Sequence, residues 1–249
     1  RSKVFCFHKN DVQNMNEQFS RTELLFGSDA VNHLKDCNVA VFGVGGVGGY
    51  VVEALTRSGI GNITIIDNDT VCASNINRQI IALHSTIGEY KVDVAEKRIK
   101  DINPNCKVTK HRMFYLPDNA DEIDLSIYDY VVDCIDTVSA KIELITRCNK
   151  LGVNLICSMG TANKVDPTAF RITDISKTQV DPLAKIIRKK LRKLGISNLK
   201  VLYSEEEPSC KTIEMNEKGR PIAASNSFVP ATAGLLIGGE VIKELIKDY

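Results

Sequence analysis

The stretch 38–69 constrains the fold of this chain more than any other part of the sequence. It opens with four apolar residues, 39–42, and such an uninterrupted run is typical of a strand buried on both faces of a parallel sheet. Gly43, Gly45 and Gly48 follow with the spacing G-x-G-x-x-G. A turn with this spacing lets the backbone approach a phosphate group closely, because no Cβ atom stands in the way.

A helix and a second strand are predicted after the glycine turn. The helix begins near Gly46 and ends at Gly59, where glycine tolerates the left-handed conformation that follows many helices. Its first N–H groups and the positive end of its dipole favour an anion at the turn. The strand 63–66 then leads to Asp67, about twenty residues on, where an acid usually binds a ribose hydroxyl. The pattern favours a nucleotide site over a purely structural turn, and leaves open which nucleotide.

A polar loop is predicted at 67–81, directly after the second strand, because the segment is rich in Asn, Asp, Ser and Thr. Ligands of open α/β sheets bind at the carboxyl ends of the strands, so this loop is expected beside the phosphates. The candidate ligand contacts in it are Asp67, Asp69, Asn75, Asn77, Arg78 and Gln79.

Lys91 and Asp136 are two further candidate site residues. Lys91 falls in the first turns of a helix predicted at 87–102, where a cation is unfavourable, so it needs an external anion or a solvated position. Asp136 is expected at the end of a strand at 128–135, in the same topological place as Asp67. Acids at two strand ends suggest a shared site with a divalent cation between acid and phosphates. The alternative for Asp136 is the N-cap of the next helix.

The whole pattern predicts an α/β fold: a Rossmann-like, doubly wound, mostly parallel sheet with a C-terminal extension that carries a basic helix. We expect 1–14 to be a tag or a disordered extension, 15–160 to be the nucleotide-binding core, and 161–249 to bind substrate and form a dimer within the same domain. An edge strand is expected at 170–175, and a final apolar helix on the sheet or at a subunit interface.

The basic helix is predicted to start at Asp181 and Pro182, with a capping acid and a proline at the first helical position. No acid balances its cations, which favours contact with a polyanion such as RNA as an alternative to a merely solvated face. The cations are Lys185, Arg188, Lys189, Lys190, Arg192 and Lys193.

Composition excludes several classes of protein. The net charge is +1, from 32 basic and 31 acidic residues, so any surface that binds a polyanion must be local. No apolar run is long enough to span a membrane, and no export signal is evident, so we expect a cytoplasmic protein without a membrane partner. The eight cysteines form no C-x-x-C pair, which argues against zinc, and Cys134 and Cys157 are expected to be buried thiols.

Two nucleotide chemistries fit the spacing, hydride transfer with NAD(P) and chemistry on ATP. Hydride transfer would favour a catalytic His, or a Tyr–Lys pair, near a strand end, and the four histidines do not cluster with the site. Arg78, Lys91 and Arg21 could bring cations to the phosphates, and Asp136 could hold Mg²⁺. These residue types favour ATP.

The combined motifs resemble the ThiF/MoeB/HesA superfamily of ubiquitin-activating-like adenylating enzymes. The resemblance rests on GVGGVG at 43–48, SNINRQ at 74–79, GEYK at 88–91 and DCIDT at 133–137, with FSRTELLFG at 19–27 near the N-terminus. Later blocks, such as SMGTANKVDPT at 158–168 and SNSFVPATAG at 225–234, resemble its tRNA threonylcarbamoyladenosine dehydratase branch. The zinc-binding C-x-x-C pairs usual in the sulfur-carrier-activating branch are missing.

The resemblance implies a site for ATP and Mg²⁺ at the glycine turn, with Asp67 on the ribose. It implies that Asn75, Arg78 and Lys91 hold the phosphates, that Asp136 places Mg²⁺, and that Arg21 reaches the other subunit of a homodimer. The implied reaction is adenylation of the threonylcarbamoyl carboxylate beside a tRNA anticodon, followed by ring closure within the same side chain.

Two alternative functions remain open on the sequence alone: an activator of a ubiquitin-like sulfur carrier, and an NAD-dependent dehydrogenase. A cysteine desulfurase or sulfur-acceptor system is a further candidate partner implied by the resemblance. Among the cysteines, Cys210 is the candidate thioester carrier, although the ring closure needs none.

Overall fold

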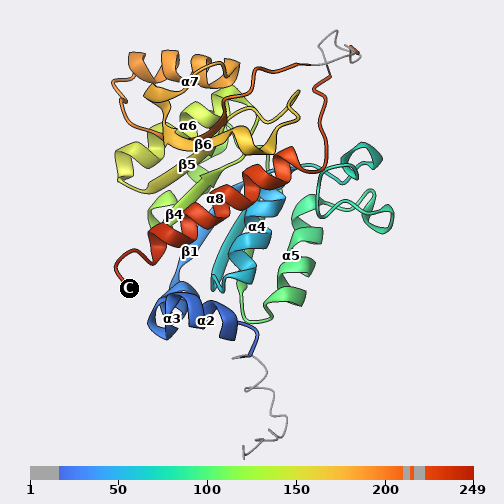
Figure 1. Cartoon of the computed structure of the whole chain (residues 1–249), viewed down its shortest axis with the longest axis vertical. Coiled ribbons are helices and arrows are strands. Elements are labelled where there is room, and N and C mark those ends of the chain that lie inside the picture. The colour runs from blue at the N-terminus through green and yellow to red at the C-terminus, as the bar shows by residue number, and fades with distance from the viewer. Residues whose placement is uncertain (1–16, 210–213, 216–221) are drawn as a thin grey trace, which may run out of the picture.

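The computed structural model describes residues 17–209, 214–215 and 222–249, and in these ranges the chain forms a sheet with helices on both faces (Figure 1). The strands are β1 (Asn38–Phe42), β2 (Asn62–Ile66), β3 (Lys107–His111), β4 (Tyr130–Asp133), β5 (Asn154–Ser158), β6 (Phe170–Asp174) and β7 (Lys200–Ser204). The helices are α2 (Ser20–Phe26), α3 (Ser28–Asp36), α4 (Gly48–Arg57), α5 (Lys91–Ile102), α6 (Val138–Leu151), α7 (Pro182–Lys193) and α8 (Val229–Leu245). Short 3-10 turns lie at Ala73–Asn75, His84–Thr86, Pro117–Glu122, Leu125–Ile127, Pro167–Ala169 and Ile175–Lys177.

The sheet has seven strands in the described ranges, in the order β3-β2-β1-β4-β5-β7-β6. Every pair is parallel except β6 and β7, which run antiparallel at one edge. The predicted α/β fold with a doubly wound, mostly parallel sheet is therefore confirmed, and so is the edge strand expected at 170–175.

The two faces of the sheet carry different helices because successive side chains of a strand point to opposite faces. On β1, Val39 and Val41 pack with α4, α5 and α8, whereas Ala40 and Phe42 pack with α6. α4 leads from β1 to β2 on one face, and α6 leads from β4 to β5 on the other. The chain therefore changes faces between β1 and β4, and at such a switch point the carboxyl ends of the strands leave a crevice.

The C-terminal helix α8 packs directly against α4, as Figure 1 shows. A Cβ atom at Gly234 would lie 2.4 Å from the carbonyl oxygen of Val47, so only glycine allows this close approach. The inner side of α8 is thus part of the core, while Leu235 and Leu236 remain 50% and 41% exposed. Its buried residues also share a core cluster with β1, β5 and β7, so docking on the sheet, one of the two expected positions, is confirmed.

One local expectation, the end of the strand at 128–135, was wrong. β4 ends at Asp133 rather than running on to Asp136, because the carboxylate of Asp133 accepts a hydrogen bond from the N–H of Ile135 and the backbone turns there. Leu24 and Leu25 are 89% and 74% exposed on α2. Leu194 is 51% exposed just after α7.

The start of α7 was predicted correctly. Asp181 is its N-cap and accepts a hydrogen bond from the N–H of Ala184, and Pro182 is its first residue. The segment 1–14, Cys210 and parts of 205–221 lie outside the described residues. Among the helices in the described ranges, none combines the length and the hydropathy needed to cross a membrane.

Candidate nucleotide-binding site

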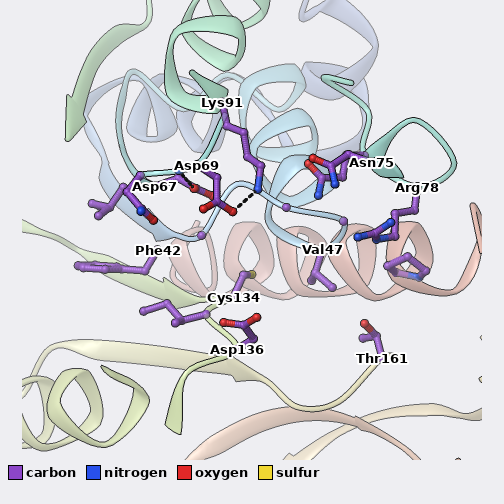
Figure 2. A pocket seen from close by; sticks show the side chains of 18 of the residues that line it. Phe42, Val47, Asp67, Asp69, Asn75, Arg78, Lys91, Cys134, Asp136 and Thr161 are labelled. Carbon is purple, nitrogen blue, oxygen red and sulfur yellow. Dashed lines mark hydrogen bonds and ion pairs between the residues drawn. The ribbon is translucent and has the colours of Figure 1, made fainter. Parts of the chain in front are cut away.

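A cavity of about 370 Å³ lies at the carboxyl ends of the first four strands, at the switch point (Figure 2). Its volume is within the range of about 300–1,000 Å³ found for small-molecule sites. The expected residues that line it are Gly43, Gly45, Gly46, Asp67, Asp69, Asn75, Arg78, Gln79, Lys91 and Asp136. The structure thus brings together residues from four separate segments, the glycine turn among them, that the sequence had assigned to one site.

The glycine turn combines two kinds of glycine. Gly43 has a φ of +88°, and a Cβ atom on it would lie 2.8 Å from the carbonyl oxygen of Cys134, while one on Gly48 would lie 1.8 Å from the carbonyl oxygen of Gly43. Gly45 differs, because the nearest atom to its Cβ position is Nε2 of Gln79 at 3.8 Å. Packing within the protein explains why Gly43 and Gly48 are glycines. At Gly45 the absent side chain leaves open space on the cavity side that a phosphate could approach.

Asp67 is held by backbone N–H groups at the end of β2. One carboxylate oxygen accepts a hydrogen bond from Val44 at 2.7 Å, and the other accepts one from Asp69 at 2.9 Å. Burial raises the pKa of Asp67, and the charge of Lys91 partly offsets that effect. Each oxygen keeps a second lone pair, which a ribose hydroxyl could use.

Lys91 is not solvated, and of its two expected positions the structure favours the one beside an anion from outside the helix. It is the first residue of α5 and only 5% exposed, and its Nζ donates to Oδ2 of Asp69 at 2.6 Å (Figure 2). The carboxylate of Asp69 offsets the unfavourable position at the start of a helix. Because an ammonium group has three donors, Lys91 can also reach a phosphate in the cavity.

Some polar side chains of the loop after β2 face the cavity, and others make hydrogen bonds that hold the loop in shape. Asn75 is buried and accepts a hydrogen bond from the N–H of Cys72. Arg78 donates to the carbonyl oxygen of Ser74 at 2.8 Å and to Asn77 at 2.9 Å, which aims its guanidinium at the cavity.

Gln79 is available to a ligand, whereas Asn77 is used in a contact within the protein. Gln79 is 7% exposed and lines the cavity, and its Oε1 atom has no hydrogen-bond partner in the described part of the chain. Buried polar atoms are normally paired, so this amide is available to a ligand. Asn77 instead donates to the carbonyl oxygen of Ser225 and is not part of the cavity wall.

Asp136 faces the cavity from the loop between β4 and α6 (Figure 2). Its carboxylate is exposed and accepts one hydrogen bond, of 3.3 Å, from the hydroxyl of Thr137. Thr137 occupies the N-cap position of α6, so the alternative of Asp136 as the cap was wrong. The carboxylate is therefore available to a cation.

A divalent cation would need ligands from the nucleotide at this site. Within the described residues, no group of three or more His, Cys, Asp or Glu side chains could hold a metal by itself. Mg²⁺ commonly binds one or two carboxylates together with the phosphates of its substrate. The single carboxylate of Asp136 fits that arrangement.

An apolar wall completes the cavity, and sequence reasoning missed it. It consists of Phe42, Ile66, Met113, Phe114, Tyr115, Cys134 and Ile135. The rings of Phe42 and Tyr115 meet edge to face, with centroids 4.9 Å apart. These residues end or directly follow strands. Their positions could therefore have predicted that they line the same cavity as the polar residues at the strand ends. The wall gives the cavity an apolar side that a base could contact.

Cys134 is half-buried in this wall rather than fully buried as expected, whereas Cys157 is fully buried. Burial raises the pKa of Cys134 to about 12. The thiol in the cavity is therefore protonated at neutral pH and is a poor nucleophile.

The remaining candidate residues lie away from the cavity. On α7, all six cations except Arg188 are exposed, and Arg188 donates to the carbonyl oxygens of Ile175 and Thr178. Arg21 is exposed on α2, beside the amino-terminal edge of the sheet, where Phe19 packs near Gly59. Figure 1 shows α2 at the end of the molecule opposite α7. Gly48, at the start of α4, lies behind the turn.

Comparison with known proteins identifies the family. The model described as the ThiF family matches residues 19–248. The chain belongs to the ThiF family. The tRNA threonylcarbamoyladenosine dehydratase of Bacillus subtilis is 46% identical over 245 residues, which cover 94% of this chain and 96% of that protein.

Solved structures of the same kind of enzyme share the fold. The Escherichia coli tRNA N6-threonylcarbamoyladenosine dehydratase in complex with ATP matches with a TM-score of 0.85 and 33% identity, over 96% of this chain and 97% of the other. The complex of that enzyme with AMP gives 0.86 and 33%, over 98% of both chains. The superfamily resemblance drawn from the motifs is confirmed.

Proposed function

We propose that this protein is an ATP-dependent tRNA threonylcarbamoyladenosine dehydratase. The observation that carries the proposal is the convergence of Arg78, Lys91 and Asp136 on one cavity beside the glycine turn. The similarity to dehydratases over nearly the whole chain supports the same function. Hydride transfer with NAD is less well supported, because no histidine of the described residues lines this cavity.

The first step is adenylation of the substrate. The threonylcarbamoyl carboxylate attacks the α-phosphorus of ATP, the bond to the bridging oxygen breaks, and pyrophosphate leaves. Arg78, Lys91 and the N–H groups of the glycine turn line the cavity and stabilise the negative charge that moves onto the leaving oxygen. Asp67 binds the ribose. When bound at Asp136, Mg²⁺ would neutralise phosphate charge.

The second step closes a ring within the activated side chain. A nitrogen of the same side chain attacks the acyl carbon, and AMP leaves with the oxygen that the substrate loses, so the sum of both steps is the loss of one water. Well-placed intramolecular attack can reach an effective molarity of about 10⁵ M or more. Positioning therefore suffices, and a thioester is not needed.

Two surfaces outside the cavity complete the proposal. The exposed cations of α7 form a local basic surface for tRNA, while the whole chain has a net charge of only +1. Arg21 lies on α2 beside the amino-terminal edge of the sheet, whereas the cavity lies at the carboxyl ends of the strands. We therefore propose that it serves the cavity of a partner in a homodimer. The exposed Leu24 and Leu25 beside it on α2 would be covered in such a dimer. A cysteine desulfurase or sulfur-acceptor partner stays a prediction.

The proposal is tested by measuring ATP consumption with and without total tRNA, followed by mass analysis of the nucleosides. We expect tRNA to stimulate release of AMP and pyrophosphate, and one modified adenosine to lose the mass of a water. Stimulation by a small ubiquitin-like carrier protein instead of tRNA would identify the sulfur-carrier activator. Binding of NAD in preference to ATP would identify the dehydrogenase.

Replacing Cys134 by serine is expected to leave kcat close to that of the unchanged protein. The reason is that its thiol is protonated at neutral pH and the ring closure needs no thiolate. The measurement is AMP release with tRNA, and Cys72→Ser, at an exposed position, is the control. A large loss in Cys134→Ser alone, together with a trapped thioester on the unchanged protein, would show covalent catalysis.

Neutralising Lys189, Lys190 and Arg192 together to glutamine is expected to weaken tRNA binding and flatten its salt dependence. Three lost phosphate contacts should reduce the slope of log K against log salt by about 2. Binding is measured by fluorescence anisotropy at several salt concentrations.

The matched control removes three exposed cations elsewhere, with the variants Lys35→Gln, Lys107→Gln and Lys247→Gln combined. Both triple variants have the same net charge. If both reduce the slope equally, or neither does, α7 is not the tRNA surface.

A further inference from the structure

Lys141 is a fully buried lysine outside the cavity. It lies on the first turn of α6 and is 0% exposed, a rare environment for this residue type. Its Nζ donates to Oδ2 of Asp133 at 2.9 Å and to the carbonyl oxygen of Ser158 at 2.8 Å. Lys141 therefore connects the last residue of β4 with the last residue of β5.

Asp133 links this ion pair to the loop that follows β4. It is also 0% exposed, and its other oxygen, Oδ1, accepts a hydrogen bond from the N–H of Ile135 at 3.0 Å. Cys134, between them, donates its N–H to the carbonyl oxygen of Phe42 at 2.8 Å. The loop is thus fixed on one side to the buried ion pair and on the other to the residue before the glycine turn.

Asp136 depends on that loop for its position. Its side chain is exposed, and the one hydrogen bond that it accepts comes from the adjacent Thr137. No contact from another element holds the carboxylate within the described structure. The backbone of the loop therefore determines where the carboxylate points.

We propose that Lys141 is a positioning residue that acts through Asp133 to hold the carboxylate of Asp136 toward the phosphates of ATP. The proposal rests on the role assigned to Asp136 in the proposed function. An apolar pair of similar volume would fill the same space without the cost of desolvating two charges. What the ion pair adds is a fixed orientation of the Asp133 carboxylate. Because Lys141 holds Oδ2, Oδ1 is kept in place to accept the hydrogen bond from the N–H of Ile135.

The deciding variant is the double replacement Asp133→Leu with Lys141→Met, which removes both buried charges and leaves neither unpaired. We expect it to unfold at nearly the temperature of the unchanged protein, because replacing both partners of a buried pair by apolar residues is often neutral. We expect kcat to fall by about 10²-fold, the size of effect that a misplaced catalytic group can have. The KM for ATP should change little.

A second readout needs no tRNA. Calorimetry measures the affinity for ATP with and without Mg²⁺. In the unchanged protein, Mg²⁺ should tighten ATP binding through Asp136. In the double variant this effect of Mg²⁺ should be lost, while ATP binding without Mg²⁺ is retained.

The matched control is the pair Glu53→Gln with Arg98→Met, which removes an ion pair between α4 and α5 that does not line the cavity. It should retain both kcat and the effect of Mg²⁺. A stable Asp133→Leu, Lys141→Met protein with unchanged kcat and unchanged Mg²⁺ effect overturns the positioning role.

Two further outcomes can be told apart: a double variant that does not fold, and an unchanged protein that does not dehydrate tRNA. If the double variant does not fold, Ile135→Pro replaces it. Proline has no N–H, so this variant loses the hydrogen bond from residue 135 to Asp133 and keeps the buried ion pair. Full turnover in that variant overturns the proposal, and lost turnover with retained ATP binding supports it. If the unchanged protein itself fails to dehydrate tRNA, the proposed function fails, and the Mg²⁺ effect on ATP binding still decides the positioning role.

Discussion

Replacing Asp136 by alanine is expected to lower kcat for tRNA-dependent AMP formation by about 10²-fold or more, the scale for losing one preorganised charge contact. The carboxylate faces the cavity, and its one protein contact is the hydroxyl of Thr137. Removing it should therefore disturb the fold little. ATP binding in the absence of Mg²⁺ should persist, because the glycine turn, Asp67 and Lys91 are unchanged.

The control for this prediction is Asp118→Ala, which removes an exposed carboxylate from the 3-10 turn Pro117–Glu122. Thermal unfolding of both variants checks the fold. Near-normal turnover in Asp136→Ala would remove this residue from the mechanism. An equal loss in both variants would point to a general effect of surface charge.

Mixing subunits is expected to restore activity to the variant Arg21→Ala. Alone, this variant should lose about 10²-fold or more in kcat if Arg21 stabilises charge in a partner's cavity. A dimer of one Arg21→Ala subunit and one Asp136→Ala subunit contains one complete site, built from Arg21 of one chain and Asp136 of the other. Random mixing should therefore recover about a quarter of the full activity, as expected for a two-fold symmetric dimer.

The heterodimers need to be verified, for example by two affinity tags purified in sequence. The exposed residue Arg57, near the amino-terminal edge of the sheet, gives the control variant Arg57→Ala, which should be fully active before mixing. No recovery in a verified heterodimer would place the action of Arg21 within one chain. Full activity of Arg21→Ala alone would exclude it from the reaction.

The sequence was most informative where the backbone itself makes the site. The spacing of Gly43, Gly45 and Gly48 predicted the turn, and strand-end positions predicted that Asp67 and Asp136 would face one cavity. These are local rules: a turn of this kind needs glycine, and parallel strands bring their carboxyl ends to the same edge.

What could not be predicted depends on contacts between distant elements. The partner of Lys91 is Asp69, 22 positions earlier in the sequence, and the pairing becomes visible only when α5 is placed beside the loop after β2. Arg188 was grouped with the other cations of α7 because a charge pattern does not reveal that one guanidinium binds the carbonyl oxygens of a neighbouring turn. The buried pair of Lys141 and Asp133 has the same origin, since neither residue type suggests burial.

The close packing of α8 on α4 has a consequence for synthesis of the protein. Pro230, in the first turn of α8, lines the cavity, and a Cβ atom at Gly46 would lie 3.3 Å from it. The ribosome makes α8 long after the glycine turn, so a nascent chain that already holds β1, α4 and β2 still lacks one wall of the cavity. Nucleotide should therefore assist folding fully only once α8 has emerged, and until then the side of α4 that α8 covers stays exposed.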